Sequence, residues 1–182
     1  MMSLLRACYD FECRIFQEVN RYFDNKYLNL FFRTITQIGG AAFTIGTVLI
    51  MIIFSTSQTR ITAIVSALAL LFSHIPVSIV KKLYPRKRPY LMLEKTKFPA
   101  NPLEDHSFPS GHTTAIFSVI MPFVIHIPVL AFILIPLGLC VGISRIYLGL
   151  HYPSDVISGM ILGSSVAGFC YDLSGIYGGW SI

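Results

Sequence analysis

Charged side chains are scarce in this chain: Asp, Glu, Lys and Arg make up 13% of its 182 residues, whereas hydrophobic residues make up 54%. A typical soluble domain contains about 25% charged residues, so the composition excludes an ordinary water-soluble domain. The formal net charge is +5, yet half of the 14 Lys and Arg residues are confined to one stretch between two apolar runs, residues 81–97. We expect this stretch to meet anionic lipid headgroups, and we expect no nucleic-acid partner.

Residues with the spacing of a metal or cofactor site are also lacking. The four cysteines, at positions 8, 13, 140 and 170, have no metal or redox spacing. Cys140 and Cys170 lie inside apolar runs, so we expect buried free thiols. Glu104, Asp105 and His106 could supply metal ligands, but three adjacent residues cannot easily face one ion, so a polar loop is the favoured interpretation. No nucleotide-binding loop is present. The sequence therefore predicts neither a metal nor a cofactor.

Long runs without charge predict membrane-spanning helices, each of which needs about 20 mostly apolar residues. Residues 107–144 lack Asp, Glu, Lys and Arg over 38 positions, which suits two spans with a break near residue 127. Backbone groups in lipid must pair internally, so each run should be helical. We predict an all-α polytopic membrane bundle with five spans, at residues 34–57, 61–80, 111–126, 128–145 and 155–171.

The N-terminal segment, residues 1–33, has a different pattern. Apolar residues recur at intervals of three and four from Leu4 to Phe23, with charges between them. This pattern predicts an amphipathic helix in the membrane interface; the alternative is a partly inserted sixth span packed on the bundle. Eight charges in the first thirty residues interrupt any apolar core, so we expect no cleavable signal peptide. Residues 34–182 would form the membrane domain.

Five spans would place the loops at 81–110 and 146–154 on the same side of the membrane. Three polar segments would then meet there: Lys81 to Pro89, Pro109 to His112, and Ser144 to Asp155. Counting Lys and Arg by the positive-inside rule would put this side in the cytoplasm. Because a phosphate site would use the same charges, the count leaves the orientation open.

The segment from Ser144 to Asp155 contains a candidate nucleophile. Pro153 favours the first turn of a helix, so His151 should lie just before the last span. Asp155 can then accept a hydrogen bond from one ring nitrogen of His151, which leaves the other nitrogen free to attack. Arg145 offers a planar fork of donors for phosphoryl oxygens. Taken alone, this histidine and aspartate could equally form a structural pair at the interface.

The segment from Pro109 to His112 precedes the third predicted span. Ser110 is a plausible N-cap, and Gly111 lets backbone amides approach an anion at the helix N-terminus. His112, in the first turn, can reach the oxygen of a leaving group as a general acid. An ordinary capping turn is the alternative, but such a turn does not require a histidine.

The first polar segment adds Lys81 and Arg88, which can turn toward the same phosphate. Such cations, with backbone donors, stabilise the charge of a phosphoryl transition state without a metal. The alternative is snorkelling of long basic side chains at a lipid interface. We assign the other basic residues of this loop to that alternative: Lys82, Arg86, Lys87, Lys95 and Lys97.

Together, the patterns K-x6-R-P, P-S-G-H and S-R-x5-H-x3-D resemble the signature of the type 2 phosphatidic acid phosphatase superfamily, which also contains vanadium haloperoxidases. Every position is filled at the right spacing between Lys81 and Asp155. The resemblance implies that His151 forms a phosphohistidine, that Asp155 orients it and that His112 protonates the leaving group. It also implies, without any metal, a set of residues that bind the phosphoryl oxygens: Lys81, Arg88, Ser110, Gly111 and Arg145.

The resemblance further implies a lipid phosphate as substrate, in the membrane of a bacterium. We favour undecaprenyl pyrophosphate, which would place the active site on the outer side; phosphatidylglycerophosphate and phosphatidic acid are the alternatives. A vanadate-dependent haloperoxidase is disfavoured because those relatives are soluble, and a non-catalytic membrane protein because both histidines and the aspartate are retained. Members of this type commonly have six spans, whereas the N-terminal segment here is amphipathic, so the lipid entrance could be built differently.

Overall fold

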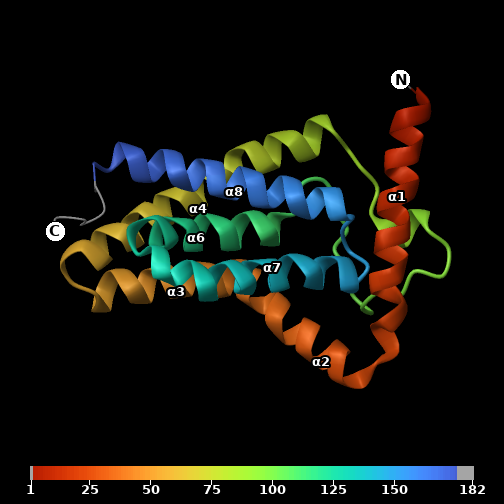
Figure 1. The fold of residues 1–182 in the computed structure, drawn as a ribbon, viewed down its shortest axis with the longest axis horizontal. Coiled ribbons are helices and arrows are strands. Elements are labelled where there is room, and N and C mark those ends of the chain that lie inside the picture. The colour runs from red at the N-terminus through yellow and green to blue at the C-terminus, as the bar shows by residue number, and fades with distance from the viewer. Residues whose placement is uncertain (1, 176–182) are drawn as a thin grey trace.

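The structure is a computed structural model that describes residues 2–175, and every regular element in this range is helical. Most of the longer helices run alongside one another, and the N-terminal helix stands across one end of them (Figure 1). In chain order the elements are α1 (Met2–Asn20), η1 (Arg21–Asp24), α2 (Lys26–Ile35), η2 (Thr36–Gly39), α3 (Ala41–Phe54), α4 (Ser57–Leu83), α5 (Pro89–Met92), α6 (Gly111–His126), η3 (Pro128–Leu130), α7 (Ala131–Tyr147) and α8 (Pro153–Leu173).

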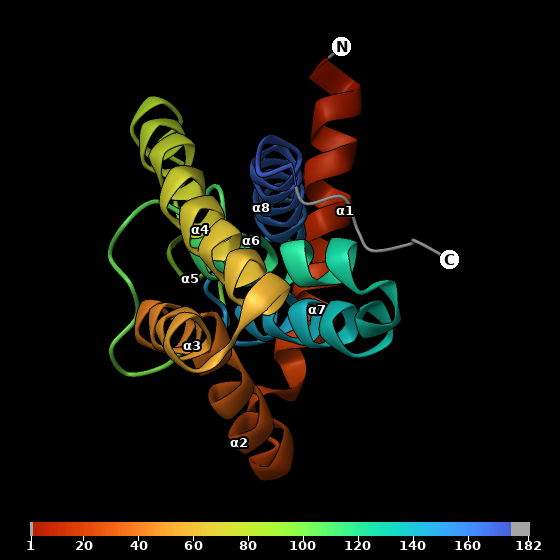
Figure 2. The same cartoon turned by 90° about the vertical axis from the view of Figure 1, so that its left-hand side faces the viewer.

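Helix α6 occupies the centre of the bundle, and α4, α7 and α8 pack around it (Figure 2). Nearly every side chain between Thr113 and Phe123 is buried. Helix α8 approaches α6 closely at Gly159 and Gly163, where an added Cβ atom would lie only 2.6 Å from the carbonyl oxygen of Ser110 and 2.5 Å from that of Thr114. The Gly-x3-Gly spacing on α8 therefore forms a close contact face with α6.

Three of the predicted spans correspond to helices that are long and apolar enough to cross a membrane: α4, α8, and the continuous stretch Pro128–Tyr147. A fourth, α6, begins and ends where the sequence predicted, but it has only 16 residues. Because other helices enclose it, its backbone is shielded by protein rather than by its own length. The all-helical membrane bundle is therefore confirmed.

The first predicted span differs from the structure. Residues 34–57 were expected to form one helix, but the chain breaks at Gly39 and Gly40, and the segments Lys26–Gly39 and Ala41–Phe54 meet at a bend of 54°. Gly40 is extended, with ψ of 153°, and begins α3 as its N-cap. If this bent pair counts as one span, the helices of residues 2–175 provide four spans by length and composition.

The loops after α4 and α7 lie at the same end of the bundle, beside α1 (Figure 1). The three polar segments therefore meet, as the predicted order of spans requires. The helix predicted near the N-terminus is present as α1. Its location in the membrane interface stays a prediction.

Candidate functional site

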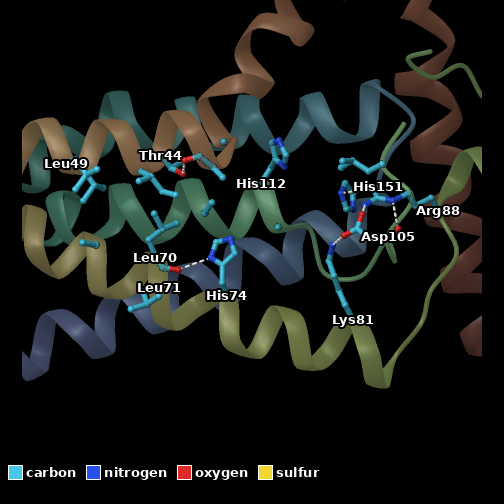
Figure 3. A pocket seen from close by; sticks show the side chains of 18 residues that line it. Thr44, Leu49, Leu70, Leu71, His74, Lys81, Arg88, Asp105, His112 and His151 are labelled. Carbon is cyan, nitrogen blue, oxygen red and sulfur yellow. Dashed lines mark hydrogen bonds and ion pairs between the residues drawn. The ribbon is translucent and has the colours of Figure 1, made fainter. Parts of the chain in front are cut away.

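A cavity of about 550 Å³ lies among α3, α4, α6 and the loops at this end of the bundle. Figure 3 shows its two parts: Lys81, Arg88, Asp105 and His151 gather at one end, and leucine side chains line the other. The apolar part is formed by residues of α3 and α4: Ile45, Val48, Leu49, Ala67, Leu70 and Leu71. The cavity thus joins a strongly polar end to an apolar groove between two helices.

His74 lies in the wall between these two parts (Figure 3). Its Nδ1 atom is 2.8 Å from the carbonyl oxygen of Leu70, one helical turn earlier in α4. His74 is bonded within its own helix and also lines the cavity.

The loop between α7 and α8 folds back so that His151 faces the cavity. The backbone N–H groups of Leu150 and His151 donate to the carbonyl oxygen of Arg145, at 3.1 and 3.2 Å. Gly149, with φ of 74°, provides the left-handed turn that this return requires. The spacing S-R-x5-H thereby brings the imidazole back beside the end of α7, where it is 1% exposed.

Arg88 fixes the tautomer of His151. Its Nη1 atom lies 3.1 Å from Nε2 of His151, and because a guanidinium can only donate, Nε2 must accept. The ring proton is then on Nδ1, which faces Oδ2 of Asp155 at 3.6 Å. This distance is longer than a hydrogen bond, and Nδ1 has no other hydrogen-bond partner within residues 2–175. Asp155 therefore faces Nδ1 of His151 as expected, but the two side chains do not form a hydrogen bond.

Burial also sets the protonation state of His151. Removal from water lowers the pKa of its imidazole, Asp155 opposes this effect, and the guanidinium groups of Arg145 and Arg88 add to it, leaving a pKa of about 4. The ring is therefore neutral at pH 7. Its reactive lone pair is on Nε2, the atom that now accepts from Arg88.

Asp155 is held from both sides of its carboxylate. Oδ2 accepts from the backbone N–H of Tyr152 at 2.8 Å and from the hydroxyl of Ser107, and Oδ1 accepts from Nη1 of Arg86 at 2.7 Å. The bond to Tyr152 is part of a capping box at the start of α8, with Pro153 in the first turn as predicted. The structure thus corrects the assignment of Arg86 to lipid snorkelling, because its guanidinium binds Asp155, which faces His151.

Asp105 bridges the two cations that the sequence assigned to phosphate binding. Its carboxylate pairs with Lys81 in the last turn of α4, and with Nη2 of Arg88 at 2.5 Å. The carbonyl oxygen of Asp105 also accepts from Nε of Arg88 at 2.7 Å. Burial alone would raise the pKa of Asp105, but Lys81 and Arg88 lower it to about 2. The sequence placed this residue in a polar loop without any such contact.

Arg145 is the predicted cation with unused donors. It is 3% exposed and donates from Nη1 to the hydroxyl of Thr36 at 2.9 Å, whereas its Nε and Nη2 atoms find no partner in the described part of the chain. Unpaired buried donors are costly, so this guanidinium is suited to receiving an anion. With His112 it lines a second cavity of about 360 Å³, whose wall includes Gln37 and Asn101.

The N-terminus of α6 forms another wall. Ser110 is the N-cap: its buried hydroxyl accepts from the backbone N–H of Thr113 at 3.4 Å and from its hydroxyl at 2.9 Å. Gly111 and His112 line the large cavity, whereas Ser110 is not part of its lining. The first turn of α6 thus presents backbone amides and an imidazole to the same space as His151, a favourable place for an anion.

Comparison with known proteins identifies the family of this chain. The model of the PAP2 superfamily matches residues 62–176. Bacitracin transport permease protein BcrC of Bacillus licheniformis is 32% identical over 117 residues, which cover 64% of this chain and 57% of that protein. An undecaprenyl-diphosphatase of Sulfolobus acidocaldarius is 29% identical over 123 residues, covering 66% and 58%. The matched regions therefore span less than two thirds of these relatives.

Two solved structures share the fold. The crystal structure of Aquifex aeolicus LpxE has a TM-score of 0.78 at 23% identity and covers 88% of this chain and 94% of its own. That of a transmembrane PAP2-type phosphatidylglycerolphosphate phosphatase from Bacillus subtilis has a TM-score of 0.74 at 24% identity, covering 92% and 86%. The superfamily model covers more than half of the chain and includes all three polar segments. This integral membrane protein belongs to the PAP2 superfamily.

Proposed function

We propose that this protein is a lipid phosphatase that hydrolyses a phosphate or diphosphate on a membrane lipid through a phosphohistidine at His151. The observation that supports this most is the composition of the large cavity, where two cations and three histidines adjoin an apolar groove. A phosphorylated headgroup would lie at the polar end, and its hydrocarbon tail would lie between α3 and α4. A water-soluble phosphate ester has no hydrocarbon tail to fill this groove.

In the first step, Nε2 of His151 attacks phosphorus, and the bond from phosphorus to the leaving oxygen breaks. His112, in its protonated form, gives its proton to that oxygen. Nδ1 of His151 keeps its own proton, so the phosphorylated ring is positive and faces the carboxylate of Asp155. Arg88 must release Nε2 and turn to the phosphoryl oxygens at this stage.

In the second step, water attacks phosphorus, and the electron pair of the P–N bond returns to Nε2 of His151. The neutral His112 takes a proton from this water and is ready for another cycle. Lys81, Arg88 and Arg145 provide the positive charge that the equatorial oxygens need. No step of the proposal therefore requires a metal.

For the substrate, we favour undecaprenyl pyrophosphate, because the relative from Sulfolobus acidocaldarius bears the name of a phosphatase for that lipid. The site would then face the outside of the cell. The name of the Bacillus subtilis structure supports phosphatidylglycerophosphate as a second candidate. Both lipids carry phosphate on a long apolar tail, and the groove suits either.

The test is phosphate release by the purified protein in detergent, with undecaprenyl pyrophosphate, phosphatidylglycerophosphate and phosphatidic acid compared at equal concentrations. We expect release from at least one of them and its loss in His151→Ala. His126→Ala is the matched control, because this histidine contacts Tyr171 near the other end of α6. Release from none of the lipids, or full activity of His151→Ala, would contradict the proposal.

A further inference from the structure

Arg86 lies two residues before Arg88, in the loop after α4, and its guanidinium bridges two carboxylates. Nη1 donates to Oδ1 of Asp155 at 2.7 Å and to the hydroxyl of Ser154 at 2.8 Å. Nη2 pairs with Oε1 of Glu12 on α1. The guanidinium also lies 4.0 Å from the centre of the Tyr152 ring. Its side chain is 18% exposed, so these contacts are shielded from water.

Glu12 connects the N-terminal helix to the first turn of α8. Its side chain is 15% exposed, and its second oxygen, Oε2, accepts from the hydroxyl of Ser154 at 2.5 Å. On the same face of α1, the ring centroids of Tyr9 and Phe16 each lie 6.0 Å from that of Tyr152, the residue after His151. Helix α1 therefore packs directly behind the nucleophile.

These contacts determine how Asp155 is held. Oδ2 has Tyr152 and Ser107 as donors, and Oδ1 has Arg86. Without the guanidinium, Oδ1 would lose this donor, and the carboxylates of Asp155 and Glu12 would repel each other across a poorly hydrated space. The carboxylate would then turn, and the Oδ2 atom that faces Nδ1 of His151 would leave its place.

We infer that Arg86 is a positioning residue that orients Asp155 toward His151, and that Glu12 holds Arg86 in place. Helix α1 therefore contributes to the geometry of the active site through Glu12. The inference rests on the proposed function. Neither Arg86 nor Glu12 lines the two cavities described above, so neither side chain is expected to touch substrate. Their loss should reduce the chemical step and leave phosphate binding in place.

The test compares Arg86→Ala, Arg86→Lys and the control Lys87→Ala, which removes the neighbouring, exposed lysine of the same loop. Loss of the outer hydrogen-bond partner of a metal ligand typically costs about ten- to a hundredfold in activity, and we take the same scale for the partner of Asp155. We expect such a fall in kcat for Arg86→Ala, with KM and the inhibition constant of inorganic phosphate within about twofold of wild type. Arg86→Lys should recover part of the loss, and Lys87→Ala should match wild type.

Three results would overturn the inference: wild-type kcat in Arg86→Ala, no recovery in Arg86→Lys, or a loss found mainly in KM and phosphate inhibition. The last would make Arg86 a phosphate ligand. The melting temperature in detergent identifies any variant that fails to fold. If the Arg86 variants fail to fold, Glu12→Gln tests the inference instead, because it keeps the shape of the side chain and does not alter Asp155. This variant should still lower kcat several-fold.

A double-mutant cycle tests the link to α1. If Glu12 acts through Arg86, then Glu12→Gln combined with Arg86→Ala should be no slower than Arg86→Ala alone. If the fold-losses in kcat of the two single variants multiply in the double variant, Glu12 acts independently of Arg86. That result would contradict the inference that Glu12 anchors Arg86. Wild-type protein assayed alongside separates the two hypotheses: an inactive wild type refutes the proposed function, whereas an active wild type with an equally active Arg86→Ala refutes only this inference.

Discussion

Arg88 donates to Nε2 of His151 at 3.1 Å and to the carboxylate of Asp105 at 2.5 Å, so one side chain joins the imidazole to this carboxylate. It also donates to the carbonyl oxygens of Asp105 and Leu150, both at 2.7 Å. A residue expected only to bind phosphate therefore also sets the tautomer of the nucleophile and holds two loops together.

Arg88→Lys should be nearly as damaging as Arg88→Ala. A lysine keeps the charge but cannot make these four contacts from one planar group. We expect kcat/KM to fall by about a hundredfold or more, in keeping with the loss of several charge-assisted hydrogen bonds. Steady-state kinetics in detergent provide the measurement, with Lys82→Ala as the control at an exposed lysine. A Lys variant within a few-fold of wild type would show that charge alone is sufficient.

Asp105→Asn should strengthen inhibition by inorganic phosphate. The carboxylate of Asp105 now engages Lys81 and Arg88, and its low pKa of about 2 keeps it ionised throughout the neutral range. A phosphate must displace this negative charge before it can use the same cations. Removing the charge should lower the inhibition constant about fivefold, or by about 1 kcal/mol.

The control for this experiment is Glu104→Gln, which neutralises the exposed neighbour of Asp105 in the same loop. It should leave phosphate inhibition unchanged. Weaker inhibition in Asp105→Asn would mean that Asp105 instead holds the two cations in place for substrate.

The acid limb of the pH profile should lie well below the ordinary titration range of histidine. Burial, with Arg145 and Arg88, lowers the pKa of His151 from 6.5 to about 4 against the opposing effect of Asp155. As the pH falls through this value, Nε2 takes up a proton and loses the lone pair that attacks. After correction for titration of the substrate, kcat/KM should therefore show no loss from the nucleophile above a pH of about 5. A limb centred near 6.5 would indicate a solvated imidazole.

Ala67→Phe should discriminate against long lipid tails. Ala67 lines the apolar part of the cavity, and a phenyl ring there would fill space that the tail needs. We expect kcat/KM for a long-chain lipid phosphate to fall about tenfold, corresponding to about 1.4 kcal/mol, with little change for a short soluble phosphate ester. Leu68→Phe is the control, since Leu68 is 42% exposed and lies outside the cavity lining. Equal losses on both substrates would mean that the tail does not occupy this groove.

Much of this site could be predicted because its parts depend on local pattern. Ser110 caps α6 and Pro153 opens α8, as their residue types favour. The order of apolar runs brings the end of α4, which carries Lys81, and the loop that carries His151 to one end of the bundle. The bend at Gly40 was missed because a count of charges detects the apolar run but not the direction of the helix within it. Residues 34–57 contain no charge on either side of the break.

The contacts of Arg86 and Asp105 could not be predicted from spacing. Arg86, Lys87 and Arg88 follow one another, and the local sequence offers no reason why the first should bind Asp155 and the third His151. That choice depends on where α1 and α8 place Glu12 and Asp155, which are 143 residues apart in the chain. The partners of Asp105 likewise come from the tertiary arrangement of its loop against α4.

The most direct test of the central claim is to trap the covalent intermediate. Protein mixed briefly with a lipid labelled in its reactive phosphate, then quenched in base to preserve the P–N bond, should carry the label on the peptide that contains His151. His151→Ala should carry none, whereas His112→Ala should retain the ability to be labelled from a substrate with a good leaving group. Label on any other residue, or wild-type turnover by His151→Ala, would contradict the account.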